Sequence, residues 1–440
     1  MNNENAAYYR YNLLLAATSP LLALFLAQRF LSGKSRPGWS ERWGHLPSFD
    51  SLSPNRIWVH AVSAGEVVAS LPILRALKSS FPDHALFLSV ITPAGHEVAV
   101  KQAAAWLEGL FYAPFDLPWV VKRVVRTLRP QLYVSLESEL WPNLLHMLKR
   151  HGVNTALVNG RITPRSFERA RRFAPGLFRW MLGNVDLLLM QSQADAERVA
   201  VLGGAPVEGR IHVVGNTKFD QELHPLDRAR REQMKAELRL PLEAPVLVAG
   251  STRSANEERI VVQAFLQMRR RLPSLCLIVA PRQLSRVEET LQILRQANLN
   301  PARRTSPQAS VTDCLVLDTM GELADVYAVA DVAFLGNTFP PVVQGGGQNI
   351  LQPLAHGKPV LHGPHYATIR AEVALAQEAG VAFPVANAEE LAAKALQLLG
   401  DKCLLEKLAH RAQSLIQANR GASQRCIEAL APLLKAGALR

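Results

Sequence analysis

Cysteine is scarce in this sequence. Its 440 residues hold four, and all of them lie in the second half: Cys276, Cys314, Cys403 and Cys426. None of these has the Cys-x-x-Cys spacing, which argues against a disulfide framework or a zinc site and is typical of a reducing compartment. No internal repeat or low-complexity segment stands out, and 26 Gly with 28 Pro is near average usage, which argues against long disordered tracts.

Acidic residues are outnumbered, 37 against 49 Lys and Arg, so that the formal net charge is +12. Such a balance suits an anionic partner such as phospholipid, a phosphorylated lipid or nucleic acid, and by itself it does not choose among them. The hydrophobic content of 48% is enough core for two α/β domains.

A mostly apolar run, residues 13–31, lies near the amino terminus. As a helix it would reach roughly 28 Å, barely one bilayer core. Lys34, Arg36 and Arg42 follow it while a single Arg precedes it, which predicts that the body of the protein lies on the cytoplasmic side. No small-residue cleavage site is evident. We therefore expect a membrane anchor at residues 1–34, either spanning the bilayer or lying flat as an amphipathic helix.

Short apolar runs alternate with amphipathic segments along the rest of the chain. They are residues 57–62, 85–91, 132–136, 155–158 and 187–190 in the first half, and 246–250, 276–280, 314–317, 332–335, 360–361 and 382–385 in the second. This alternation predicts an α/β protein of two Rossmann-like domains, residues 35–215 and 216–440, that face each other across a cleft. The boundary is expected between Gly215 and Leu240, where a charged helix at 226–238 would follow the linker, and ligands are expected in the cleft.

Acidic side chains follow two of the predicted strands. Glu66 would stand in the first turn of a helix, whose dipole favours the ionised carboxylate by ~0.3–1 kcal/mol and keeps it available as a proton acceptor. Simple helix capping explains a Glu there equally well. Alternation would turn Glu137 and Glu139 toward one face, where one pKa would rise, although either could instead bind a backbone N–H at the helix start.

Basic and glycine-rich segments follow other strands. The run 161–172 would cover an anionic acceptor, although such runs are usually solvated helix faces. Lys218 and Arg282 stand at strand ends, where they would balance the charge of a leaving phosphate. Residues 345–347 are all Gly and precede a predicted helix, which favours close backbone approach to a nucleotide and binding of its phosphate by N–H groups.

Six segments, taken in their order along the chain, together resemble the 3-deoxy-D-manno-octulosonic acid (Kdo) transferases. These are inner-membrane glycosyltransferases of the two-Rossmann-domain GT-B type. The segments that carry the resemblance are residues 60–66, 137–143, 215–220, 280–282, 318–323 and 345–365, and the similarity runs from the amino-terminal apolar run to about Leu398. Helices from Leu404 onward are expected, by analogy with similar transferases, to return to the first domain.

The resemblance implies inverting transfer of Kdo from CMP-Kdo to a lipid A precursor, in lipopolysaccharide core synthesis on the cytoplasmic face of the inner membrane. Glu66 matches the catalytic base, and Glu137 and Lys218 match transition-state stabilisers. The implied nucleotide contacts are Pro281, Arg282, Met320, Gly321, Glu322, Asn349, Ile350, Leu351 and Gln352. We also expect Ser63, Arg161 and Arg165 to contact the acceptor.

The expected partners are therefore a CMP-sugar donor, a phosphorylated lipid acceptor and the membrane, and not nucleic acid. No cofactor and no metal are expected, because protein cations can balance a monophosphate leaving group and no Asp-x-Asp pair stands out. The chain departs from the family pattern at Gln348, Gln352 and Arg253, where the family usually has His, Glu and His. Two alternatives follow: a divergent paralogue that transfers another nucleotide-activated sugar, and a non-catalytic lipid-binding protein of the same fold.

Overall fold

The computed structural model describes residues 5–33, 36–49, 51–221, 227–306, 312–343 and 345–436. The chain forms two compact units, unit 1 from Met1–Gln221 with Asn419–Arg440 and unit 2 from Glu222–Ala418. The chain thus changes unit after Gln221, within the range between Gly215 and Leu240 where the boundary was expected, and it returns to unit 1 at Asn419. Residue 34, where the predicted anchor ends, and residue 226, where the predicted charged helix begins, lie outside the described residues.

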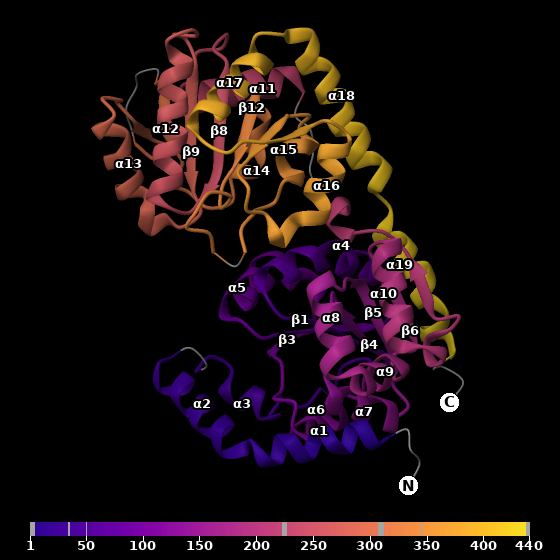
Figure 1. The fold of residues 1–440 in the computed structure, drawn as a ribbon. Coiled ribbons are helices and arrows are strands. Elements are labelled where there is room, and N and C mark those ends of the chain that lie inside the picture. The colour runs from indigo at the N-terminus through magenta and orange to yellow at the C-terminus, as the bar shows by residue number, and fades with distance from the viewer. Residues whose placement is uncertain are drawn as a thin grey trace. The chain divides into compact units, whose positions relative to one another are not determined.

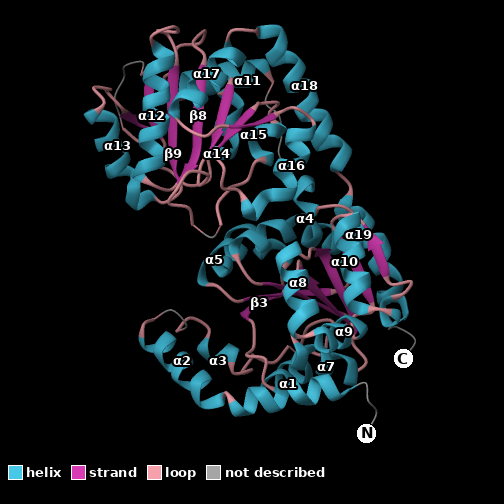
Figure 2. Ribbon diagram, in the orientation of Figure 1, coloured by secondary structure: helices cyan, strands magenta, loops and turns pink. Residues whose placement is uncertain are grey.

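Unit 1 is built on a sheet of seven parallel strands within the described residues, in the order β3-β2-β1-β4-β5-β6-β7. The strands are β1 (Arg56–Ala61), β2 (Ala85–Val90), β3 (Gly109–Tyr112), β4 (Leu132–Leu136), β5 (Asn154–Gly160), β6 (Leu187–Met190) and β7 (Ile211–Val213). Helices cover both faces of the sheet (Figure 2), so its central strands β1 and β4 are buried throughout. Strands β3 and β7 were not predicted, because these short edge strands are only partly buried.

Unit 2 repeats this plan with the order β10-β11-β9-β8-β12-β13-β14, again parallel. Its strands are β8 (Val246–Thr252), β9 (Cys276–Pro281), β10 (Ala302–Arg303), β11 (Cys314–Val316), β12 (Val332–Leu335), β13 (Val360–His362) and β14 (Ala382–Pro384). The predicted α/β class with two parallel sheets is confirmed. Strand β10 was missed because it is two residues long and lacks an apolar run.

Helices connect the strands, and side-chain caps begin many of them. Unit 1 contains α3 (Trp39–Arg42), α4 (Ala64–Ser80), α5 (Pro93–Gln102), α6 (Pro118–Leu128), α7 (Pro142–Arg150), α8 (Pro164–Phe173), α9 (Pro175–Gly183), α10 (Gln193–Gly203) and the short η4 (Thr217–Asp220). Unit 2 contains α11 (Arg228–Glu237), α12 (Ala255–Arg269), α13 (Val287–Gln296), α14 (Leu323–Val326), α15 (Leu351–Ala355), α16 (Arg370–Glu378) and α17 (Ala388–Leu399), and α18 (Lys402–Asn419) leads out of it. The caps Ser63, Thr92 and Thr163 each accept a first-turn N–H, which fixes where α4, α5 and α8 begin.

The strand order reverses at the first strand of each unit. Strands β2 and β3 lie on one side of β1 and strand β4 lies on the other, and β8 has the same position between β9 and β12. Loops that follow the two strands of such a pair diverge, and the crevice they leave is where α/β sheets bind ligands. This strand order predicts such a crevice between the ends of β1 and β4 in unit 1, and between the ends of β8 and β12 in unit 2.

The carboxyl-terminal helix α19 (Ala422–Ala436) belongs to the core of unit 1, where it packs beside α4 (Figure 1). Its side chains Cys426, Ile427, Leu430 and Leu434 are buried in the same cluster as the strand residues of β1 and β4. The carboxylate of Asp220 accepts the N–H groups of Gly421 and Ser423, both at 2.6 Å, and so caps this helix.

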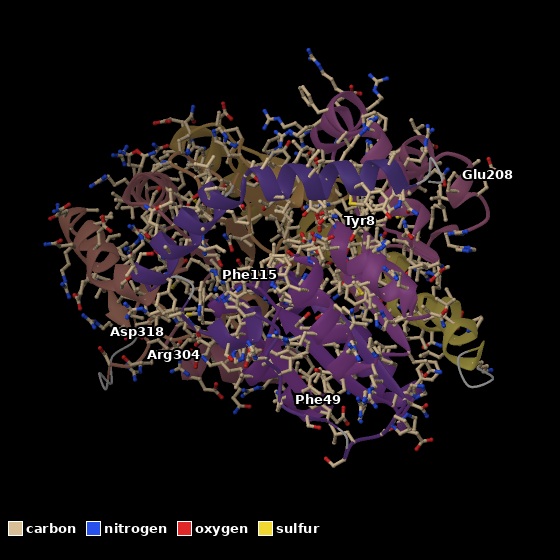
Figure 3. All side chains as sticks on the ribbon, turned by 90° about the horizontal axis from the view of Figure 1, so that it is seen from below. Tyr8, Phe49, Phe115, Glu208, Arg304 and Asp318 are labelled. Carbon is tan, nitrogen blue, oxygen red and sulfur yellow. The ribbon has the colours of Figure 1, made fainter. Side chains whose placement is uncertain are left out.

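The predicted single helix at the amino terminus is wrong. The segment forms α1 (Ala6–Ala17) and α2 (Ser19–Leu31), bent by 62° at Thr18, and no single described helix is long and apolar enough to span a membrane. Pro20 lies in the first turn of α2, where its lack of an N–H costs no helical hydrogen bond. In the interior of one continuous helix the same residue would remove such a bond, which explains the break at this point. The ring of Tyr8 stacks on Trp180 at 5.0 Å, so α1 packs on α9 within unit 1 (Figure 3).

Replacing Leu430 by Ala should lower the free energy of unfolding of unit 1 by about 2–5 kcal/mol, because it removes a fully buried side chain. Urea unfolding followed by tryptophan fluorescence measures the change. Leu242→Ala, at an exposed position, is the control and should stay within about 0.5 kcal/mol of the wild type. Equal effects of the two substitutions would contradict the assignment of α19 to the core.

Candidate functional site

Glu66 lies in the first turn of α4, directly after β1, and forms a capping box with Ser63. Its Oε2 accepts the N–H of Val62 at 2.8 Å, and the Ser63 hydroxyl donates to Oε1 at 3.2 Å. The Ser63 oxygen in turn accepts the N–H of Glu66 at 3.4 Å. The helix capping that was one of the two interpretations of Glu66 therefore occurs. It also fixes the carboxylate at the carboxyl edge of the sheet.

The environment of Glu66 works against its ionised form. Burial raises its pKa to about 7, and the negative charges of Glu137 and Glu139 add to the rise, while the bonds from Val62 and Ser63 oppose it. The carboxyl group thus titrates near neutral pH, where it can gain and lose a proton. The expectation that the helix dipole would keep Glu66 ionised was too simple, because loss of solvent outweighs the dipole here.

Glu137 occupies the other side of the crevice, directly after β4. Its carboxylate lies 3.4 Å from the Lys218 Nζ and 3.8 Å from an Nη of Arg161. The residue has a φ of 54°, a left-handed conformation that costs roughly 1–2 kcal/mol outside glycine. Such conformations persist mostly at functional sites, so the strain is consistent with a functional position of the side chain.

Glu139 faces a different environment from Glu137. Strand β4 ends at Leu136, so the alternation that predicted the two carboxylates on one face does not extend to them. Instead the Trp141 Nε1 donates to Glu139 Oε2 at 3.1 Å, and burial raises the pKa of this carboxyl group, with a smaller contribution from Glu137. A pKa rise was predicted for one carboxyl group of this pair from the charge of the other, and it occurs at Glu139, where burial and not the neighbouring charge is its main cause.

Lys218 is positioned by Thr217, which lies in the predicted segment 215–220, and by Asn159, which the sequence pattern did not single out. It lies in η4, where Thr217 is completely buried and donates its hydroxyl to the carbonyl oxygen of Ala69 at 3.1 Å. The buried side chain of Asn159, at the end of β5, accepts the Thr217 N–H at 3.1 Å. Asn159 carries no charge and lies outside the segments that the sequence pattern singled out, which is why it gave no signal in the sequence.

The three predicted acceptor contacts differ in their surroundings. Arg161 follows β5 and approaches Glu137, whereas Arg165 lies on α8 with its side chain exposed. Ser63 is engaged with Glu66. The structure therefore brings Glu66, Glu137, Lys218 and Arg161 together at one edge of the unit 1 sheet, with Arg165 on the helix that follows.

The predicted nucleotide contacts come from three segments of unit 2. Pro281 and Arg282 lie at the end of β9, Met320, Gly321 and Glu322 precede α14, and Asn349, Ile350, Leu351 and Gln352 begin α15. All three segments lie beyond the carboxyl ends of the parallel strands β9, β11 and β12. The side chains of Pro281, Ile350 and Leu351 are buried, which leaves only the backbone of these three residues for a ligand.

Polar contacts order the same segments. Thr319 donates its hydroxyl to Glu322 Oε2 at 2.7 Å, and Asn349 Oδ1 accepts the N–H of Leu351 at 3.0 Å. One first-turn N–H of α15 is thus already taken, although the sequence predicted free N–H groups there. Helix α15 spans only five residues. Imidazole Nε2 of His356, which follows α15, lies 2.8 Å from the carbonyl oxygen of Ala324 in α14, so the two segments are in contact.

The glycine segment requires glycine. Gly345, Gly346 and Gly347 all have positive φ, between 82° and 92°. A Cβ at Gly346 would lie 2.4 Å from the carbonyl oxygen of His365, which the backbone does not tolerate. Within the parts of the chain that the structure describes, no group of three or more His, Cys, Asp and Glu side chains is placed to hold a metal ion.

Comparison with known proteins gives consistent findings. Residues 37–221 match the family model "3-Deoxy-D-manno-octulosonic-acid transferase (kdotransferase)". The 3-deoxy-D-manno-octulosonic acid transferase of Chlamydophila psittaci is 30% identical over 78% of this chain and 77% of its own length. That of Haemophilus influenzae is 29% identical over 97% of this chain and 98% of its own. Among solved structures, a glycosyltransferase from Rickettsia africae covers 87% of this chain and 99% of its own, with a TM-score of 0.59 and 13% identity, and shows a shared GT-B-like fold.

Replacing Glu66 by Gln should stabilise the protein relative to the wild type increasingly as the pH rises from about 4.3 to about 7. In this window the folded wild type keeps a proton that the unfolded chain releases, so its free energy of unfolding falls with rising pH, and above about 7 the difference is constant. Urea unfolding at a series of pH values measures it.

Glu97→Gln is the matched control for this series. The hydrogen bond from Lys101 lowers the pKa of the exposed Glu97 carboxyl group, so this variant and the wild type should differ by a constant amount across the same window. A constant difference for Glu66→Gln as well would mean that Glu66 ionises like a free carboxyl group.

Proposed function

The chain belongs to the 3-deoxy-D-manno-octulosonic acid (Kdo) transferase family and is a glycosyltransferase, and from this premise we propose that it moves Kdo from CMP-Kdo to a phosphorylated lipid A precursor with inversion at the anomeric carbon. The observation that carries the proposal is Glu66, a carboxyl group with a pKa near 7 at the switch point of a parallel sheet.

Glu66 supplies the general base. As the acceptor hydroxyl oxygen attacks the anomeric carbon, its proton passes to the Glu66 carboxylate while the bond between that carbon and the CMP oxygen breaks. A base with a pKa near the working pH combines a useful ionised fraction with a real affinity for the proton. Attack on the face opposite the leaving group gives inversion in one step and needs no covalent intermediate. The capping box holds the carboxylate in one orientation throughout.

Glu137 and the two cations beside it shape the charge of the site. Lys218 lies 3.4 Å and Arg161 lies 3.8 Å from the Glu137 carboxylate, so this carboxylate holds both cations at the crevice. Fixed cations stabilise negative charge as it develops during transfer, because they need no reorganisation at that moment. We assign Glu137 and Lys218 to this role, and Ser63, Arg161 and Arg165 to the acceptor side.

The donor is assigned to unit 2. The segments around Arg282, residues 320–322 and residues 349–352 lie beyond the carboxyl ends of neighbouring parallel strands, as nucleotide sites do in this architecture. CMP leaves as a monophosphate, so protein cations and backbone N–H groups suffice to balance its charge, and we propose transfer without a metal or a cofactor. Tighter binding of UDP than of CMP would instead favour the divergent-paralogue alternative.

The amino-terminal helices supply the proposed membrane contact. Leu13 and Leu14 on α1 are exposed, and so are Leu21, Leu24 and Phe25 on α2, in a segment with no acidic residue. Both ends of the pair are held by unit 1, since the Tyr11 hydroxyl donates to Asp116 at 3.1 Å and Phe30 packs on Trp39 at 4.8 Å. A segment held at both ends is suited to lie in the interface of the bilayer.

A basic groove on α6 supports the same orientation. The exposed Trp119 and four cations, Lys122, Arg123, Arg126 and Arg129, line a cavity of about 630 Å³. Arg123 donates to the Trp43 carbonyl oxygen at 3.2 Å, which links α6 to the segment after α2. Clustered cations beside an aromatic side chain suit anionic headgroups. We therefore propose the cytoplasmic face of the inner membrane as the location.

Replacing Glu66 by Gln should reduce Kdo transfer by at least about 100-fold, because a positioned general base contributes ~10²–10⁴. The assay follows radiolabelled Kdo from CMP-Kdo to a tetra-acylated lipid A precursor in the presence of EDTA, and the wild type should keep its activity there. CMP binding should be unchanged, because Glu66 lies in unit 1 and the nucleotide segments lie in unit 2.

The pH profile distinguishes a base from a structural residue. Wild-type kcat should fall about tenfold per pH unit below about 7, as Glu66 becomes protonated, and the residual activity of Glu66→Gln should lack this decline. Glu97→Gln should retain wild-type turnover. If Glu66→Gln kept full activity, the role of this residue as base would be refuted.

Serine at Leu21, Leu24 and Phe25 together should weaken co-sedimentation with phosphatidylcholine–phosphatidylglycerol vesicles by at least about tenfold, because each buried apolar side chain contributes about 1.5–3 kcal/mol. The control replaces the exposed Val201 and Leu242 by Ser and should bind as the wild type does. Equal binding by the two variants would remove α2 from the proposed membrane contact.

A further inference from the structure

Strands β8 and β9 carry an irregularity that changes which residues end up side by side. Gly250 pairs with Ala280, but the next pair is Thr252 with Pro281, so Ser251 is an extra residue in β8. Its φ of 59° is the left-handed conformation that such bulges use. Without the bulge Thr252 would pair with Arg282, whereas with it the residues that follow the last pair are Arg253 and Arg282.

Arg253 and Arg282 therefore lie side by side, directly after the last paired residues of the neighbouring strands β8 and β9. The Arg282 N–H donates to the Thr252 carbonyl oxygen at 2.9 Å, which fixes the level, and adjacent strands are about 4.8 Å apart. Two guanidinium groups are placed on one edge of the unit 2 sheet. The bulge is what aligns them.

The guanidinium of Arg253 is poorly compensated by the protein. Its Nε is buried and has no hydrogen-bond partner within the described residues. No carboxylate in the described part of the chain forms an ion pair with Arg253 or Arg282. The pKa of Arg253 is lowered by burial and by the charge of Arg282. A partly desolvated pair of like charges attracts an anion, which relieves the repulsion and satisfies donors together.

Glu257 forms no ion pair with either arginine, but its carboxylate positions the backbone of Arg253. This buried carboxylate accepts the N–H of Arg253 at 3.0 Å, of Asn337 at 2.9 Å and of Thr338 at 2.9 Å, together with that of Phe339 at 3.1 Å. It thereby ties the end of β8 to the loop that follows β12. These are the two strands between which the order of the sheet reverses, so Arg253 lies at the switch point itself.

We propose that Arg253 and Arg282 together bind the phosphate of the donor nucleotide, with Arg253 as a phosphate-binding residue of this chain that acts beside Arg282. The inference rests on the proposed CMP-sugar donor. The phosphate carries one negative charge in the sugar nucleotide and gains a second as CMP departs, so paired guanidinium groups hold the leaving group more tightly than the donor.

Calorimetric titration of the full chain with CMP and with cytidine tests the inference, because the two ligands differ only by the phosphate. The variants are Arg253→Met and Arg253→Lys, and Arg259→Met, on an exposed position of α12, is the matched loss of charge. For Arg253→Met we expect CMP binding to weaken by about 10- to 100-fold while cytidine binding is unchanged. Arg253→Lys should recover part of the loss, because ammonium supplies charge but no planar fork.

Cytidine binding also reports whether each variant is folded. Arg259→Met should bind both ligands like the wild type. If the wild type prefers CMP over cytidine and Arg253→Met keeps that preference, the inference fails while the CMP donor stands. If the wild type itself binds cytidine as tightly as CMP, both the inference and the proposed donor fail. Equal losses in Arg253→Met and Arg259→Met would reduce the effect to net charge and also overturn the inference.

Discussion

Both units depend on one topological constraint, which is that all strands of a sheet run parallel while the strand order reverses at the first strand. Parallel strands bring every carboxyl end to the same edge, and the reversal separates two loops there. Glu66 and Glu137 follow the two strands at the reversal in unit 1, and Arg253 and Asn337 follow the equivalent pair in unit 2. The connectivity of the chain thus brings these side chains to one edge of each sheet, although they are far apart in sequence.

Within this frame, loss of solvent decides the chemistry more than direct contacts do. Glu66 has two hydrogen-bond donors and a helix terminus in its favour, yet its pKa still rises to about 7 because it is largely removed from water. Glu139 responds in the same direction for the same main reason. Glu137 lies beside two cations instead. Three carboxylates of one crevice therefore have different environments, which allows a separate role for each.

The sequence predicted most of this frame because buried parallel strands appear as continuous apolar runs, and the predicted 332–335 coincides with β12. The edge strands β3 and β7 were not predicted, since they are only four and three residues long and too short to stand out as buried strands. Single charged residues at strand ends, Glu66 and Lys218, were found from their position. The supporting side chain of Asn159 was not found, because a buried neutral side chain acquires its partner only through the tertiary fold. The bulge at Ser251 depends on backbone geometry and left no pattern either.

The return of α19 to unit 1 has a consequence for biosynthesis. The side chains of Cys426, Ile427, Leu430 and Leu434 complete a core whose other parts are encoded before residue 221. During translation the ribosome therefore produces the whole of unit 2 while unit 1 still lacks one helix, and the surface that α19 will cover stays open to solvent for that time. Until α19 leaves the exit tunnel, the amino-terminal half of the nascent chain exposes part of its apolar core, which is the kind of surface that chaperones bind.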